Sequence, residues 1–333
     1  MGLAIPVRVP ISLVYSWSMG VTTDKKQIVP RRITGIQQQL APLLIIIAGS
    51  CWGTAGIFVR LFNEWGMFAL QIATVRTIVS AIIFALLIFI TDRNLFKIKL
   101  KDIWCFIGTG CLGTALYNFC YYKTIALSSL SVAATLLYTS PIFVAIFSVL
   151  LFGEKMTVRK LVALALAFGG CLMVSGVLNS GAEGLTGKAF AIGILSGMSY
   201  AFYTIFSKFA VMLGYTGFTT TFYTFALALI PCALLADFRQ ITEAVETGGA
   251  GAILLIAAFG AVTTLIPNLS YLAGLKYVGT SKASILSAIE PVMAALFGLI
   301  LFSEVPALAT IAGMGLVVLS IGLLNLRRKE ERG

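Results

Sequence analysis

The chain has 333 residues, of which 59% are hydrophobic and 11% are charged, and its mean hydropathy is +0.98. This is more apolar surface than a soluble core can bury, so the composition excludes a soluble protein and indicates an integral membrane protein. The net charge of +11 does not indicate a nucleic-acid partner, because the basic residues stand between apolar runs. The expected partners are the lipid bilayer and a small-molecule substrate.

Histidine is absent, and the six cysteines all lie in apolar segments without a Cys-x-x-Cys pair. The commonest metal ligand is therefore missing, and the cysteines are expected to act as small packing residues. We expect no metal site, no cofactor and no disulfide framework.

Residues 1–39 are expected to form a poorly ordered cytoplasmic tail. They mix prolines and lysines with an apolar run from Ile11 to Val21 that is too short to cross a membrane. The run lacks the plan of a signal peptide, and Met19 remains an alternative start to Met1.

Ten apolar segments follow, each about long enough to cross the hydrocarbon layer as a helix. They lie at about 41–62, 66–91, 102–123, 128–152, 157–178, 186–212, 217–236, 250–275, 279–302 and 305–326. The gaps between them are short, so no soluble domain is inserted. The expected fold is an all-α integral membrane protein with ten transmembrane helices.

The chain repeats itself within these segments. Six residue types recur at a constant offset of 150. The first set is Asn118, Tyr121, Ser131, Ala133, Pro141 and Glu154, and the corresponding second set is Asn268, Tyr271, Ser281, Ala283, Pro291 and Glu304. Nearer the front of each half, Gly49, Trp52, Phe58 and Arg60 correspond to Gly197, Tyr200, Phe206 and Lys208 at an offset of 148. Such duplication is typical of secondary transporters.

The basic residues predict how the chain is oriented. With the N-terminus inside, 19 of the 24 Lys and Arg residues fall on the cytoplasmic side, four fall outside and Arg76 lies within a span. Both termini are then cytoplasmic. Because five spans per half is an odd number, the second half enters from the opposite side, so the sequence predicts inverted repeats at 40–180 and 181–327, followed by a cytoplasmic tail at 328–333.

This arrangement resembles the drug/metabolite transporter (DMT) superfamily, specifically its EamA-type carriers. The resemblance covers residues 40–327 and is carried by Arg76, by the run from Ser140-Pro141 to Gly153-Glu154, by Glu290-Pro291 and by Ser303-Glu304. It implies a central cavity lined by spans one, three, four, six, eight and nine. It also implies export of amino acids, other metabolites or toxic compounds across the cell membrane.

Glu290 is expected in the middle of span nine, where a carboxylate is costly unless it is protonated, paired or facing water. We therefore expect it to face the cavity, as a candidate proton-coupling site; a neutral glutamate that packs against another helix is the alternative. Arg76 could bind an anionic substrate or pair with Glu290, but snorkelling to the inner surface or bonding to backbone carbonyl oxygens is the favoured interpretation.

Pro141 and Pro291 are candidate hinges, because each proline displaces the carbonyl four residues earlier. A static kink is the alternative. The expected substrate-binding residues are Asn118, Tyr121, Asn268 and Tyr271, which place an amide and a phenol on one helix face in each half, together with Trp52, Tyr138, Tyr200 and Tyr203 as aromatic walls. Any single tyrosine could instead belong to an aromatic belt at the membrane surface.

The expected function is secondary active transport by alternating access, with export of a small metabolite, such as an amino acid or an amphipathic compound, and with proton coupling as an option. An intramembrane enzyme and a lipid flippase are the alternatives. We expect no catalytic residues, because the spacing reveals no nucleophile-base pair and no paired carboxylates. The sequence does not indicate the substrate, the transport direction or the oligomeric state.

Overall fold

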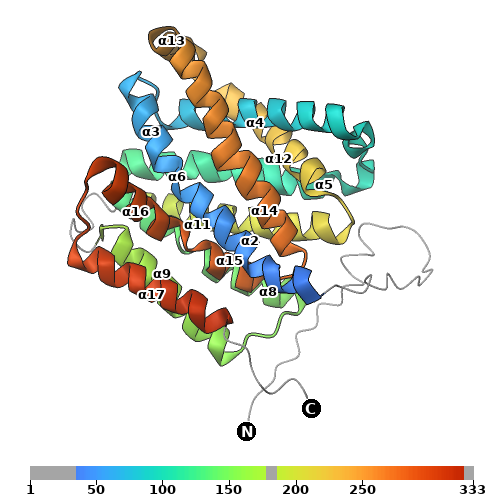
Figure 1. Ribbon diagram of the computed structural model, residues 1–333, viewed down its shortest axis with the longest axis vertical. Coiled ribbons are helices and arrows are strands. Elements are labelled where there is room, and N and C mark those ends of the chain that lie inside the picture. Colours follow the sequence, from blue (N-terminus) through green and yellow to red (C-terminus); the bar gives the residue numbers. More distant parts are fainter. Residues whose placement is uncertain (1–34, 178–185, 326–333) are drawn as a thin grey trace.

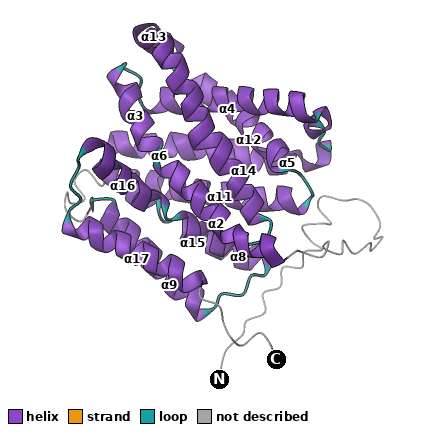
Figure 2. Cartoon of the chain, in the orientation of Figure 1, coloured by secondary structure: helices purple, strands orange, loops and turns teal. Residues whose placement is uncertain are grey.

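The computed structural model describes residues 35–177 and 186–325, and every regular element in these ranges is helical (Figure 1, Figure 2). The first range holds α2 (Gly35–Gly53), α3 (Ala55–Glu64), α4 (Ala69–Thr91), η1 (Arg93–Phe96), η2 (Leu100–Asp102), α5 (Ile103–Ile107), η3 (Gly108–Ala115), α6 (Leu116–Leu127), α7 (Leu130–Leu137), α8 (Ser140–Phe152) and α9 (Val158–Val174). The second range holds α11 (Gly187–Met212), α12 (Gly217–Leu235), α13 (Phe238–Gly260), η4 (Ala261–Leu265), α14 (Ile266–Leu275), α15 (Thr280–Ser287), α16 (Glu290–Phe302) and α17 (Leu308–Asn325).

Within the described ranges, nine helical stretches are long and apolar enough to cross a membrane. The protein is therefore a multi-pass membrane protein. The remaining predicted span corresponds to α9, whose 17 residues extend about 25 Å at 1.5 Å per residue. It packs along α17 at one edge of the molecule (Figure 1). The expected tails at 1–39 and 328–333 and the boundary between 180 and 181 lie almost wholly outside the described residues; only residues 35–39 are described, as the start of α2.

The predicted start of span eight at residue 250 coincides with a kink at Gly249, after which the second part of α13 begins. Helix α13 begins at Phe238, and the Asp237 side chain caps it by accepting hydrogen bonds from the backbone N–H groups of Arg239 and Gln240. Gly249 then bends the helix with a positive φ of 53°. The part of α13 before Gly249 contains several polar and charged residues, so the length of the apolar segment does not indicate it.

The α-helical hydrogen-bond ladder is interrupted in the middle of spans four and nine. The chain leaves the helix at Tyr138 and at Ala288, three residues before each proline. Pro141 and Pro291 are the second residues of α8 and α16, where the missing N–H removes no helical hydrogen bond. The backbone angles at Thr139 and Ile289 stay in the right-handed helical region, so each interruption is a kink within one span.

Helix packing follows the sequence repeat. Helix α14 packs on α2 as α6 packs on α11, and α15 and α16 contact α2 as α7 and α8 contact α11. Two further pairs join a helix to its own counterpart, α4 with α12 and α9 with α17. The duplication seen in the sequence is thus matched by a duplicated set of contacts.

Two glycines at equivalent positions support the helix breaks. A Cβ atom on Gly197 of α11 would lie 2.4 Å from Thr139 Oγ1 and 2.7 Å from the Leu136 carbonyl oxygen. A Cβ atom on Gly49 of α2 would lie 2.6 Å from Ile289 Cγ2 and 2.9 Å from a backbone carbonyl oxygen beside the other break. Only glycine permits this close approach of one helix to the broken backbone of another.

Each half also contains a π-helical segment, η3 in span three and η4 in span eight. Nothing in the apolar pattern indicates them. Such segments are rare and are often found at functional sites, because the wider turn reorients the side chains that follow. Here each precedes the helix that carries an asparagine of the repeat, α6 or α14.

Candidate functional site

A cavity of about 840 Å³ enters the helix bundle and meets a smaller cavity of about 110 Å³ deeper inside. The larger cavity has the volume of a typical small-molecule site. Five residues line both cavities and therefore mark their junction: Trp52, Ala55, Arg76, Tyr117 and Glu290. The larger cavity is lined by spans two, five and ten and by five of the six spans that the resemblance implies, namely one, three, four, eight and nine. Span six lines only the smaller cavity, through Tyr200 and Tyr203.

The junction carries one acidic and one basic side chain. Glu290 is the first residue of α16, so the helix break places its carboxylate at a helix N-terminus, where negative charge is favoured. Arg76 lies within α4, and its Nε atom is buried without a hydrogen-bond partner. Among the described residues, no ion pair joins Arg76 to Glu290. Both charged groups are therefore positioned to interact with a molecule in the cavity.

Aromatic side chains form the walls. The Tyr117 ring lies 5.9 Å from that of Tyr121 and 5.2 Å from that of Tyr200, measured between centroids. Trp52 packs against Tyr271 at 5.4 Å. Flat apolar walls around a few polar groups suit a small polar or amphipathic molecule.

The two repeated asparagines differ in their contacts. Asn268 donates through Nδ2 to the Thr264 carbonyl oxygen at 2.7 Å and accepts at Oδ1 from the Tyr203 hydroxyl at 2.5 Å. Asn118 makes the matching bond along its own helix, to the Thr114 carbonyl oxygen, but its buried Oδ1 has no partner. At the offset of 148, Tyr203 corresponds to Ala55, which has no hydroxyl to donate.

The predicted site residues divide into four groups. Trp52 and Glu290 line both cavities; Tyr121, Tyr138 and Pro291 line the larger one; Tyr200, Tyr203 and Asn268 line the smaller one. Asn118, Tyr271 and Pro141 line neither cavity. The two amide-phenol faces are thus split, because Tyr271 is buried with its hydroxyl bonded to Thr204 Oγ1 at 2.8 Å.

Tyr117 and Arg60 are among the cavity-lining residues that the sequence interpretation does not include. Tyr117 stands one helical turn before Tyr121 and shares its face, a spacing that could have identified it. Arg60 pairs with Glu304 at 2.6 Å and its guanidinium lies over the Phe302 ring at 4.4 Å. A contact between residues so far apart in the sequence leaves no local signal.

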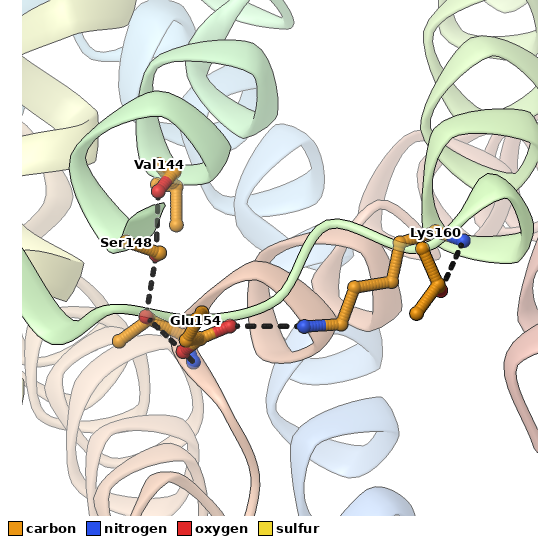
Figure 3. A network of polar contacts seen from close by, with 6 residues as sticks. Val144, Ser148, Glu154 and Lys160 are labelled. Carbon is orange, nitrogen blue, oxygen red and sulfur yellow. Dashed lines mark hydrogen bonds and ion pairs between the residues drawn. The ribbon is translucent and has the colours of Figure 1, made fainter. Parts of the chain in front are cut away.

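At the opposite end of the bundle, Glu154 follows α8 and lies in a network of polar contacts (Figure 3). Its Oε1 atom accepts from the backbone N–H and the hydroxyl of Thr280, both at 2.6 Å, and its Oε2 atom pairs with Lys160 Nζ at 3.1 Å. The Thr280 hydroxyl also contacts Ser148 Oγ at 2.5 Å. Burial of Glu154 would raise its carboxyl pKa, but the bonds from Thr280 and the charge of Lys160 outweigh burial and hold the pKa below its ordinary value.

Comparison with known proteins gives consistent results. Residues 39–176 and 187–326 each match the EamA-like transporter family. An uncharacterized transporter of Archaeoglobus fulgidus is 34% identical over 63% of this chain and 74% of its own length, and a second from the same organism is 27% identical over 86% and 99%. The uncharacterized inner membrane transporter YicL of Salmonella typhimurium is 25% identical over 87% and 96%. A solved crystal structure has the same fold, with a TM-score of 0.71 at 16% identity, over 85% of this chain and 96% of that chain.

Proposed function

Because the chain belongs to the EamA-like transporter family, we propose that it is a secondary active transporter that exports a small metabolite across the cell membrane by alternating access. One observation carries the proposal. The cavity reaches the Arg76 and Glu290 side chains from one end of the bundle, while the other end is closed around Glu154. A carrier needs such a site, open to one side at a time.

The proposed topology is ten spans in two inverted repeats, at 40–180 and 181–327, with both termini cytoplasmic. It is supported by the 19 to 4 distribution of basic residues and by the repeated set of helix contacts. In this orientation the open end of the cavity, near Arg60 and Glu304, faces outside. The closed end, near Glu154, faces the cytoplasm.

The proposed solute is a small polar or amphipathic compound, and an amino acid is the first candidate. Its carboxylate would pair with Arg76, whose buried Nε has no partner, and an ammonium group would approach Glu290. The tyrosine walls would hold an apolar side chain.

The proposed proton coupling rests on the position of Glu290. A carboxylate at the middle of a span is stable only when it is protonated, paired or hydrated. A proton and a cationic solute therefore compete for binding to the Glu290 carboxylate. Its counterpart in the first half is Ser140, so only one half offers an acid. Pro141 and Pro291 remain candidate hinges, because each lies directly after a helix break.

The proposal is tested with purified protein in proteoliposomes, with a panel of amino acids and amphipathic metabolites, with and without a pH gradient. We expect uptake of at least one solute above that of protein-free vesicles, and a pH response that is lost in Glu290→Gln. Glu243→Gln removes an equal charge from an exposed ion pair with Arg239 and is the matched control. Turnover without movement would indicate an enzyme, and translocation of labelled lipid alone would indicate a flippase.

A further inference from the structure

Two matching acids, Glu154 and Glu304, end α8 and α16, but they make different contacts in the structure. Glu154 binds the start of α15 at Thr280, whereas Glu304 binds Arg60 at 2.6 Å. The counterpart of Thr280 in the first half, 150 residues earlier, is Leu130 at the start of α7. Thr280 is fully buried, but Leu130 is 62% exposed and lines the open cavity. The contact between an acid of one half and the broken span of the other half is therefore made at the Glu154 end of the bundle and, among the described residues, is absent at the Glu304 end.

The Glu154 contact is a helix cap that joins the two halves. The first N–H groups of a helix have no partner within it, and negative charge is favoured beside them. Glu154 belongs to the first half and supplies both the acceptor and the charge to α15 of the second half, at the N–H and hydroxyl of Thr280. Gly279 leaves room for the carboxylate, since a Cβ there would lie 3.0 Å from its oxygen atoms.

We propose that Glu154 and Glu304 are positioning residues that close the two ends of the cavity in turn, each by capping the first turn of the opposite half's broken span. This inference rests on the proposed alternating-access function. In the described state Glu154 caps α15. In the other state Glu304 leaves Arg60 and caps α7, where the backbone N–H of Leu130 takes the place of that of its counterpart Thr280.

Each acid has a basic residue to receive it when it is released. Arg60, which holds Glu304, corresponds to Lys208 in the second half. In the described state Lys208 Nζ donates to the Leu275 carbonyl oxygen at 2.8 Å, and it is available to Glu154 when the cap opens. The exchange thus conserves the pairing of each carboxylate, and no acid is left buried without a partner.

The two caps are unequal. Leu130 lacks the hydroxyl of Thr280, and Ser129 stands where the glycine at position 279 makes room for the carboxylate. The Ser129 hydroxyl already accepts from the N–H of Val132 at 3.2 Å. The Glu304 cap therefore has one donor fewer and less room, so the resting protein favours closure at the Glu154 end, as described.

The test measures both ends at once with pairs of spin labels in membrane nanodiscs and without solute. Lys155→Cys with Lys276→Cys reports the Glu154 end, and the equivalent pair, Val305→Cys with Ala126→Cys, reports the Glu304 end in a variant that lacks the native cysteines. All four positions are exposed, and the pairs differ by the repeat offset of 150. The distances thus report the same motion in each half.

We expect Glu154→Gln to raise the population with a long 155–276 distance about tenfold, which corresponds to about 1.4 kcal/mol, and to shorten the 126–305 distance in the same molecules. Thr280→Val, which keeps the backbone N–H, should act in the same direction but less strongly. Leu130→Thr should also raise this population by strengthening the other cap. Glu243→Gln, which changes the charge of an exposed pair, should change neither distance.

Unchanged distances in both Glu154→Gln and Thr280→Val would overturn the inference. It would equally be overturned by a longer 155–276 distance without a shorter 126–305 distance, since that would be local fraying. The readout needs no transported solute. Failure of the transport assay with responsive distances would therefore contradict the proposed function, whereas active transport with unresponsive distances would contradict the caps.

Discussion

Gly197→Ala tests the support of the helix break in span four. The added Cβ would lie 2.4 Å from Thr139 Oγ1 and 2.7 Å from the Leu136 carbonyl oxygen. The hydroxyl cannot turn away freely, because it donates to that same carbonyl oxygen at 2.6 Å. Overpacking of this kind costs about 1–3 kcal/mol, against which alanine gains about 0.5–1 kcal/mol of helix propensity over glycine. The net expected loss of stability is about 1–2 kcal/mol.

Thermal unfolding in detergent is the assay, with Gly169→Ala in α9 as the matched control. A Cβ on Gly169 meets nothing within 4 Å, so this variant should be neutral or slightly more stable than the wild type. Gly197→Ala should lower the unfolding temperature by several degrees, at roughly 2–4 °C per kcal/mol. A variant with unchanged unfolding temperature would refute the close packing of α11 against the break between α7 and α8.

Three further predictions concern the polar groups. Glu290→Gln should leave solute exchange largely intact in proteoliposomes while removing the response to an imposed pH gradient; a surviving response would remove Glu290 as the coupling site. Asn268→Ala should lower the unfolding temperature more than Asn118→Ala, because only Asn268 Oδ1 accepts from Tyr203, and equal losses would contradict this difference. The pKa values of Glu154 and Glu304 are held below their ordinary 4.5, so their contacts are complete above that value and are lost only as the pH falls through the lowered pKa. Label distances at both ends should therefore agree at about pH 6 and pH 8, and a change between these values would contradict the lowered pKa values of the two acids as the control of these contacts.

Much of the fold follows from apolar length and from the internal repeat. Long apolar segments in a membrane have no stable alternative to a helix, so the spans could be predicted from composition and spacing. The energetic cost of a mid-span carboxylate predicts that Glu290 faces the cavity, and Glu290 lines both cavities.

The missed features depend on contacts between distant residues. The interruptions at Tyr138 and Ala288 are approached closely by Gly197 and Gly49 on other helices, so a local rule for proline predicts the kinks but not the helices that pack against them. Asn118 and Tyr121 lie in one helix, α6, but only Tyr121 lines the larger cavity. Which of them reaches the cavity depends on how the helix is rotated in the bundle, which the sequence does not determine. The ion pair of Arg60 with Glu304 likewise joins spans at opposite ends of the chain.

The central claim, that this chain moves a solute by exposing one site to each side in turn, is tested most directly by solute exchange. Proteoliposomes are preloaded with an unlabelled solute identified in the uptake panel, and entry of the labelled form is measured with no other gradient. A carrier predicts faster entry of label into preloaded vesicles than into empty ones, because the loaded site returns with its cargo. Equal rates of entry into loaded and empty vesicles would contradict alternating access.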